Sequence, residues 1–419
     1  MISSFKQYLG TTKTWQAGGR HWTPVDVCAE LLTQIVHLVE RSPAGKGALR
    51  EAVFAIPVGF TSAKRRDLRK AAQQAGIEVV QFVAEPTAAV LELSAGIKGL
   101  RKAAVFDWGG GTLDISVVAV EGGMVVEQEV AGMDRAGDSI DWKLAEAVHR
   151  FVAVQKGADV AFDRMPSSAL DRLRVAAEKT KCKLSQESES RLTVTDYGSL
   201  GHFSTQVKAT VFSSIIAEMI RDAHQLLVDT IRKRYRNPLD LDRVFMIGGS
   251  SMLPQIQERL LKSKDIGARC CLPQDAAWCV ARGAARLALN PGAHLLAEDV
   301  GLIGPDGEFF TLLEASTPVS EEELCRRFGL TEDAQLASFV FGIRRHEDGS
   351  MTGSTQPLPP QLLDELSVEC FGFCNEPIEL RLGFDPDLVL HARARSLNKT
   401  VAAEREKLFE KLRFSYQLP

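Results

Sequence analysis

The chain has 419 residues and a formal net charge of −4 at neutral pH, with 45% hydrophobic and 25% charged residues. These values are ordinary for a globular protein of two or three domains, and the slight negative charge gives no indication of nucleic-acid binding. No apolar run long enough to span a membrane is present, and the opening segment lacks the apolar core of a secretory signal. We therefore expect neither a nucleic-acid partner nor a membrane partner.

The first part of the chain alternates helical and strand patterns. Thr23 and Pro24 form an N-cap and a first helical position, and apolar residues then recur at helical spacing as far as Val39. Strands are predicted at 52–56, 77–83, 103–107, 114–120, 124–130 and 244–247, and further helices near 62–75, 138–155, 167–185, 207–234 and 280–289. This alternation is typical of an α/β domain, which we place at residues 1–292.

Beyond residue 292 the sequence changes to short alternating strands separated by turn residues. Segment 293–299 is predicted as a linker and 300–397 as a small β-rich, sandwich-like domain, in which only 321–328 has a helical pattern. The charged amphipathic segment 398–412 predicts a helix within a final region of residues 398–419.

Eight cysteines are scattered along the sequence, and no Cys-x-x-Cys pair occurs. The spacing favours reduced, mostly buried thiols over a zinc site or a disulfide framework. The cysteine usage therefore predicts a cytoplasmic protein.

The clearest motif is a glycine-rich turn that follows a buried strand. Asp107 ends the strand, and Asp114 comes two residues after the threonine that closes the turn. The turn itself contains Gly109, Gly110, Gly111 and Thr112. Backbone N–H groups of such a turn can approach phosphate closely, and a carboxylate at the strand end can hold Mg²⁺ through water. A plain glycine hairpin is the alternative, and the two acids argue against it.

A second glycine motif follows strand 244–247. Gly248, Gly249 and Ser250 lie between this strand and the helix that begins at Pro254. Paired glycines allow a flat adenosine to approach the backbone, and the helix N-terminus favours phosphate. The two motifs together suggest two halves of a domain that close on one nucleotide.

Six segments in order resemble the DnaK-type seventy-kilodalton heat-shock chaperones, a family within the actin and sugar-kinase ATPase superfamily. The segments are 55–60, 84–89, 106–116, 176–181, 247–257 and 280–285. The resemblance implies an actin-like (ribonuclease H-like) α/β fold, ATPase activity, and ATP, ADP and Mg²⁺ as ligands.

The resemblance also implies a role for each matching residue. Asp107 would orient Mg²⁺ and the attacking water, Glu85 would help to place both, and Lys6 would steady the γ-phosphate. The phosphates would be cradled by Gly109, Gly110, Gly111, Thr112, Gly137 and Asp138. The ribose and the adenine would be bound by Glu178, Lys181, Ser185, Gly248, Gly249, Ser250 and Met252. Pro57 and Arg65 would couple the nucleotide to the neighbouring domain.

The chain departs from the family pattern at its start. The first strands of the family and their Asp-Leu-Gly-Thr-Thr loop are missing; Gly10-Thr11-Thr12 is a poor substitute, because no apolar strand precedes it and Tyr8 stands in place of the acid. A misplaced start, a natural truncation and a degenerate nucleotide pocket remain open.

Single residues of the adenosine motifs also differ from the family. Ala136 replaces one of two glycines, Met252 replaces an arginine that stacks on adenine, and Ala277 replaces an acid. A thioether stacks more weakly than a guanidinium, so we expect reduced nucleotide affinity.

Residues 295–300 resemble the apolar interdomain linker of the family, and 309–318 and 378–394 resemble strands of its peptide-binding sandwich. One hypothesis is an ATP-hydrolysing, chaperone-like protein that couples nucleotide state to binding of unfolded or specific polypeptide clients, with a possible co-chaperone and with weak or lost activity. The other is a non-hydrolysing adaptor or scaffold with one dedicated protein partner. A small-molecule kinase fits less well, because the β-rich domain would have no role.

Overall fold

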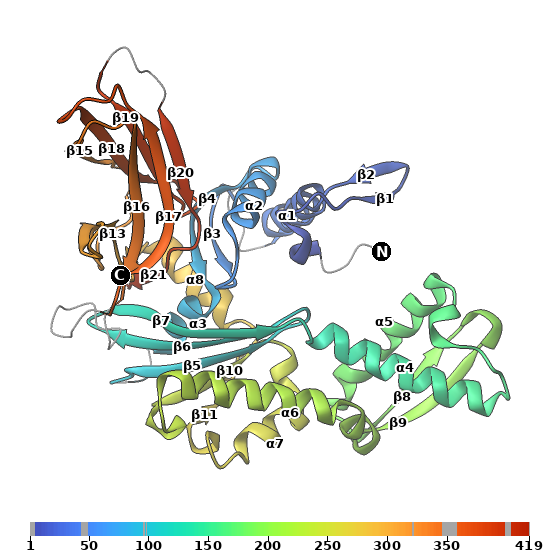
Figure 1. Cartoon of the computed structure of the whole chain (residues 1–419). Coiled ribbons are helices and arrows are strands. Elements are labelled where there is room, and N and C mark those ends of the chain that lie inside the picture. Colours follow the sequence, from blue (N-terminus) through green and yellow to red (C-terminus); the bar gives the residue numbers. More distant parts are fainter. Residues whose placement is uncertain are drawn as a thin grey trace. The chain divides into compact units, whose positions relative to one another are not determined.

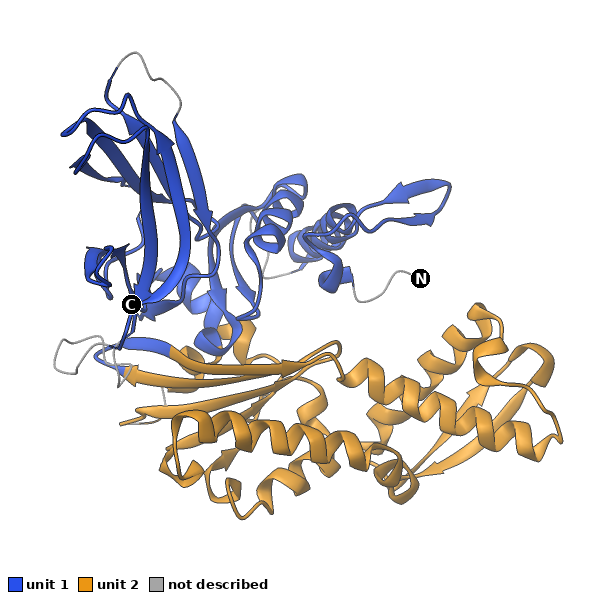
Figure 2. Ribbon diagram, viewed as in Figure 1, with its two compact units in different colours: residues 1–88, 121–126, 283–419 blue, residues 89–120, 127–282 orange. Residues whose placement is uncertain are grey.

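The computed structural model describes residues 5–42, 49–94, 97, 99–320, 322–345, 358–398 and 404–418 (Figure 1). It divides into two compact units (Figure 2). Unit 1 comprises Met1–Ala88, Glu121–Val126 and Gly283–Pro419, and unit 2 comprises Ala89–Val120 and Glu127–Arg282. Each unit is described by itself. Within the described ranges, no helix has both the length and the apolar character needed to cross a bilayer.

Unit 2 is built on a mixed sheet. In spatial order its strands are β11 (Cys270–Cys271), β10 (Arg243–Ile247), β5 (Lys102–Trp108), β6 (Leu113–Glu121) and β7 (Met124–Met133), of which the first residues of β7 belong to unit 1. β5 runs parallel to β10 and antiparallel to β6. Nearly every residue of β5 and β10 is buried, as expected of strands covered on both faces.

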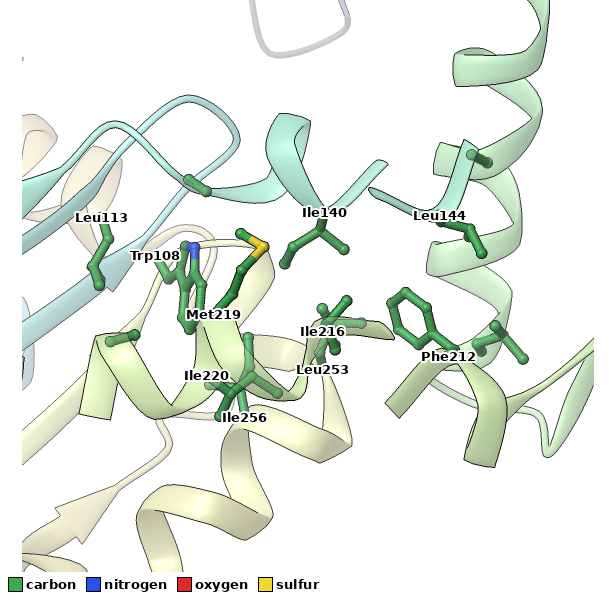
Figure 3. Packing of buried hydrophobic residues seen from close by; sticks show 14 of the residues in the cluster. Trp108, Leu113, Ile140, Leu144, Phe212, Ile216, Met219, Ile220, Leu253 and Ile256 are labelled. Carbon is green, nitrogen blue, oxygen red and sulfur yellow. The ribbon is translucent and has the colours of Figure 1, made fainter. Parts of the chain in front are cut away.

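Helices and one hairpin complete unit 2. They are α4 (Gly137–Gln155), α5 (Ser167–Leu184), α6 (Ala209–Arg234), α7 (Pro254–Leu261), and the hairpin of β8 (Glu189–Val194) and β9 (Phe203–Lys208). A single apolar cluster joins sheet and helices; Trp108 and Leu113 come from strands, and Ile140, Ile216 and Ile256 from α4, α6 and α7 (Figure 3). This core fixes the end of β5 beside the starts of α4 and α7, where the glycine motifs lie.

The first part of unit 1 is a small α/β layer. Its elements are β1 (Trp15–Ala17), β2 (Arg20–Trp22), α1 (Pro24–Arg41), β3 (Glu51–Ile56), α2 (Ser62–Gln74) and β4 (Glu78–Ala84). α1 begins at the predicted cap, where Thr23 and Asp26 bond to each other's backbone N–H groups. β3 and β4 are parallel, and they share one apolar cluster with α1 and α2. α3 (Glu85–Ser94) and α8 (Cys279–Leu289) each begin in one unit and end in the other.

The later part of unit 1 contains a β-sandwich. One antiparallel sheet has the order β14 (Phe309–Leu313), β13 (Asp299–Ile303), β16 (Leu336–Arg344) and β17 (Gln361–Glu369); the other has β15 (Leu324–Gly329), β18 (Pro377–Phe384), β19 (Leu390–Ser396) and β20 (Arg405–Phe409). The inner faces form one apolar cluster. Phe341 of β16 lies 4.8 Å from Phe409 of β20 between ring centroids, so the two sheets pack face to face.

Two short strands flank the sandwich in sequence. β12 (Ala293–Leu296) pairs antiparallel with β21 (Phe414–Gln417), and β21 also pairs with the first residues of β7. The segment that was predicted as a linker thus contains a paired strand.

Two helix predictions are wrong. Residues 324–329 form β15, and the described part of 398–412 contains β20 in place of a helix; residues 321 and 399–403 lie outside the described residues. The charged pattern of residues 398–412 is compatible with a helix, but β19 forms a ladder of backbone hydrogen bonds with β20. Glu406 forms an ion pair with Arg393, and Lys407 forms one with Asp364. Pairing with a neighbouring strand therefore overrides local helix propensity.

The other long helices are confirmed within a few residues of their predicted bounds. The hairpins β1–β2 and β8–β9 were not predicted. β1 and β2 have only three residues each, whereas β8 alternates exposed and buried residues, which is the pattern of a strand and could have been recognised.

Candidate functional site

The glycine turn after β5 is a tight hairpin. The N–H of Gly109 donates to the carbonyl of Thr112 at 3.0 Å, and the Thr112 hydroxyl donates to Asp114 Oδ2 at 2.7 Å. Asp107 and Asp114 are directly opposite each other in the β5–β6 ladder. Because opposite residues of a ladder project from the same face, both carboxylates stand on one side of the sheet.

The start of α4 is bonded onto this turn. The N–H groups of Gly137 and Asp138 donate to the carbonyls of Gly109 and Gly110, at 3.1 and 2.7 Å. A Cβ on Gly137 would lie 2.8 Å from Ser250 Oγ, so this close approach requires a glycine. Ala136, the departure noted in the sequence, lies one position earlier and is fully buried.

The second glycine motif meets the same turn. Ser250 Oγ donates to the carbonyl of Gly109 at 2.8 Å. Gly248 has a φ of +82°, and a Cβ there would lie 2.4 Å from Asp107 Oδ1, whereas a Cβ on Gly249 would meet nothing within 4 Å. The motifs that the sequence singled out separately, including Met252 at the end of the short turn Ser250–Met252, therefore lie next to one another in unit 2.

Lys181 is the residue of α5 that reaches the glycine turns. Its Nζ lies 2.8 Å from Asp141 Oδ1 and donates to the carbonyl of Gly137 at 3.3 Å. Asp141 is only 1% exposed, and burial raises the pKa of its carboxyl to about 6 although Lys181 opposes that shift. The sequence did not single out Asp141; the available signal was its place one helical turn after Gly137.

The other predicted residues of α5 bond within their own helix. Glu178 lies 4.0 Å from Arg174, and the Ser185 hydroxyl donates to the carbonyl of Cys182 at 2.6 Å. Glu178 is exposed, so its ion pair can give way to a ligand at little cost, whereas Ser185 is half-buried.

The acids of the turn suit a hydrated Mg²⁺. Mg²⁺ retains several waters and uses one or two carboxylates together with phosphate oxygens. Asp107 and Asp114 provide such a pair beside a turn of backbone N–H groups. No group of three or more His, Cys, Asp and Glu suited to a metal occurs among the described residues.

Lys6 and Glu85 form a second group, in unit 1. Lys6 Nζ, on the short helix Phe5–Tyr8, lies 2.9 Å from Glu85 Oε1 at the start of α3. Lys6 is about half exposed and Glu85 is 16% exposed, so the pair is open to a ligand on the lysine side. These residues and the glycine turns belong to different compact units.

Arg65 is buried in unit 1 on α2. Its Nη1 donates to the carbonyl of Phe60 at 2.7 Å, and its Nε donates to the carbonyl of Asp387 at 2.6 Å. The carbonyl of Pro57 in turn accepts from the N–H of Phe60. The predicted coupling residues are thus linked to the turn between β18 and β19 of the sandwich.

A known protein family matches this chain over more than half of its length. The family model described as Hsp70 protein matches residues 7–300. The chain belongs to the Hsp70 family. Both glycine motifs, Gly137 at the start of α4, and the Lys181 helix lie inside the matched range, and most of the sandwich lies outside it.

Curated relatives of this Hsp70 chain are DnaK chaperones. It is 29% identical over 263 residues to the chaperone protein DnaK of Mycoplasmopsis pulmonis, and 28% identical to those of Thermotoga petrophila and, over 264 residues, Thermosipho africanus. In each case the match covers 61% of this chain and 43% of the relative. The chain thus spans under half the length of the relatives it matches.

Proposed function

We propose that this Hsp70 chain binds ATP with Mg²⁺ at its glycine turns, hydrolyses it slowly, and couples the nucleotide state to binding of polypeptide clients. The observation that carries the proposal is the convergence of Gly109, Gly137 and Ser250 through direct hydrogen bonds. Three segments that are far apart in sequence are brought together around one glycine turn, with a strand-end carboxylate beside it.

The phosphates would be held mainly by backbone. Beyond Gly109, whose N–H is bonded to Thr112, the turn offers the N–H groups of Gly110 and Gly111 without side chains in the way, and the start of α4 adds the positive end of a helix. Gly137, Asp138 and Lys181 would complete this cradle, since Lys181 already contacts the Gly137 carbonyl.

Mg²⁺ would be held through water by Asp107, with Asp114 beside it. When bound, the ion neutralises charge on the phosphate oxygens and orients them. Asp107 is held in place because its carboxylate packs against Gly248, where a side chain cannot be accommodated.

Lys6 and Glu85 are the proposed groups for hydrolysis. Lys6 would neutralise charge on the γ-phosphate, and Glu85 would accept a hydrogen bond from the attacking water. Their ion pair keeps the ammonium and the carboxylate oriented before nucleotide binds.

The adenosine would lie over the second glycine motif. Gly248, Gly249 and Ser250 would line it, and the space beside Gly249 is open. Glu178 and Ser185 would contact the ribose and the base. Met252 is 40% exposed, so it can offer a stacking surface, although a weaker one than an arginine.

Coupling would run through Arg65 and Pro57 to the sandwich. The Arg65 guanidinium donates to the β18–β19 turn, so a movement of α2 would displace that turn directly. Clients would be unfolded or specific polypeptides bound by the sandwich, with a co-chaperone as a possible further partner. We also propose a cytoplasmic location, since all eight cysteines lie in the described ranges as free thiols.

The test is release of a bound client. A fluorescent, reduced and carboxymethylated lactalbumin should dissociate at least about tenfold faster with ATP and Mg²⁺ than with ADP, as expected when one ligand's affinity differs between two states. Asp107→Asn should abolish the difference. Equal dissociation rates with ATP, with ADP and without nucleotide would exclude nucleotide-coupled client binding.

A second candidate is a non-hydrolysing adaptor with one dedicated partner. It is favoured by the Lys181–Asp141 pair, which engages the lysine before any nucleotide arrives, and by Met252 in place of a cationic stack. Single-turnover hydrolysis separates the two: an adaptor binds ATP and leaves it intact.

A further inference from the structure

Strand β21 lies between two strands that do not pair with each other. Phe414 and Gln417 stand opposite Leu296 and Ala293 of β12, while Ser415 and Gln417 stand opposite Val126 and Met124 of β7. We call the pairing of β21 with β12 and β7 the seam. Two further backbone bonds extend it, from Ala297 N–H to the Arg413 carbonyl at 3.0 Å and from Leu418 N–H to the Gly123 carbonyl at 2.7 Å. β21 is therefore the strand through which β12 is joined to the start of β7.

Tyr416 anchors β21 by its hydroxyl. The side chain is 3% exposed, and its oxygen accepts from the N–H of Gly292 at 3.0 Å and from Nε2 of Gln81 on β4. The His294 ring meets the Tyr416 ring edge-on, with centroids 5.0 Å apart. One tyrosine thus connects β21 with β4 and with the residues on either side of the start of β12.

The backbone of residue 292 is fitted to β21. A Cβ on Gly292 would lie 2.2 Å from the Gln417 carbonyl oxygen and 2.5 Å from the Tyr416 ring. A side chain at this position would push β21 away, so the glycine is required for the seam to close.

β12 is fastened to the sandwich side independently of β21. Leu296 N–H donates to the Thr317 carbonyl at 3.0 Å, Ser316 N–H donates to the Leu296 carbonyl at 2.8 Å, and Val319 N–H donates to the His294 carbonyl at 2.8 Å. Loss of β21 would therefore leave β12 attached to residues 316–319 while removing its connection to β7.

We propose that β21 is a detachable clasp: while it is paired it joins β12 and the sandwich to the start of β7, and when it leaves the sandwich loses that connection, stays folded, and is held by the Arg65 and Arg69 contacts to the β18–β19 turn. The sandwich keeps its own core without β21, because the inner faces of two four-stranded sheets supply most of that core and β21 adds only the partly buried Phe414 at its margin. A strand this short is fixed by few backbone bonds, so its opening costs much less than global unfolding.

Hydrogen exchange of the full chain tests the clasp without nucleotide. In Tyr416→Phe, amides of 123–126, 293–297 and 414–418 should exchange about tenfold faster and together, because the hydroxyl bonds are lost. Amides of α6 and of β16 should keep their rates. Tyr235→Phe is the matched control, since it removes a tyrosine hydroxyl that bonds to Gln128 at 2.7 Å in unit 2.

A second variant keeps the test valid if Tyr416→Phe fails to fold. Gln81→Leu removes one donor to the Tyr416 hydroxyl and leaves β21 unchanged, so it should raise the same exchange rates by a smaller factor. Faster exchange of 414–418 alone, or of all segments with α6 included, would overturn the clasp. Because these arms use no nucleotide, their outcome is independent of whether the chain binds ATP.

Discussion

The guanidinium of Arg65 on α2 donates to the backbone carbonyl of Asp387, 322 residues further along the chain, at 2.6 Å. Arg69, one turn later on α2, adds an ion pair to the Asp387 carboxylate at 3.0 Å and a bond to the Pro386 carbonyl at 2.9 Å. Two arginines of one helix therefore bind Asp387. Through these contacts the small α/β layer of unit 1 is bonded to the sandwich at the β18–β19 turn.

Removing the Arg65 guanidinium should destabilise unit 1 strongly. Arg65→Met keeps the apolar stem but leaves the buried carbonyls of Phe60 and Asp387 without this donor, so the free energy of unfolding should fall by about 2–4 kcal/mol. Urea denaturation measures the change.

The adjacent Arg66 is the control. Its ion pair to Glu410, at 3.6 Å, joins two side chains that are each 41% exposed, so Arg66→Met should cost less than about 1 kcal/mol. Equal losses of unfolding free energy in the two variants would show that the bonds from Arg65 do not contribute more stability than an exposed ion pair.

Gly248 and Gly249 should respond very differently to alanine. Gly248→Ala forces a positive φ on an L-residue, which costs about 1–2 kcal/mol, and drives Cβ into Asp107 Oδ1 and the Trp108 carbonyl. We expect a total loss of more than about 3 kcal/mol. Gly249→Ala has open space, so stability should change by less than about 0.5 kcal/mol. Thermal unfolding of both variants measures the difference. Similar melting temperatures would contradict the conclusion that Gly248, but not Gly249, has no room for a side chain.

The sequence predicted the glycine turns because their requirement is local. Gly248 must be a glycine for the φ of its own backbone, and Asp107 must follow a buried strand. The features that the sequence analysis missed depend on residues far away in the sequence. β20 and β21 owe their strand form to partners more than a hundred residues away or on the next strand, and Asp141 pairs with Lys181 across two helices. No pattern within a short window contains those partners.

Lys6 should matter for turnover more than for binding. If the ammonium stabilises charge that develops on the γ-phosphate, Lys6→Ala should lower the single-turnover rate of ATP hydrolysis about 100-fold. The affinity for ATP should change little. Lys13→Ala is the control, because the Lys13 ammonium lies over the Tyr8 ring, 6.0 Å from its centroid. A loss of ATP affinity with an unchanged rate would assign Lys6 to binding instead.

His294 should make stability depend on pH. Burial, together with the nearby positive charge of Arg65, lowers the pKa of His294 to about 4 in the folded chain, while Tyr416 and Phe414 offer only rings. The unfolded chain takes up the proton first as the pH falls, so this stabilisation is complete above about pH 6.5 and is lost between about pH 6.5 and 4.

The histidine contribution can be isolated by substitution. His294→Phe should flatten the stability profile between pH 6.5 and 4 by up to about 1.4 kcal/mol per pH unit. His21→Gln, at an exposed position of β2, should leave the profile unchanged. An identical slope in His294→Phe and the unsubstituted chain would assign the dependence to other groups.

The central claim is that the glycine turn at Asp107–Asp114 binds ATP with Mg²⁺, and titration calorimetry tests it most directly. The account predicts saturable binding of ATP that requires Mg²⁺ and weakens at least about tenfold in Asp107→Asn, since a carboxylate that holds the hydrated ion is removed. Absence of binding heat at several temperatures, or equal affinity in the Asp107→Asn variant, would contradict it.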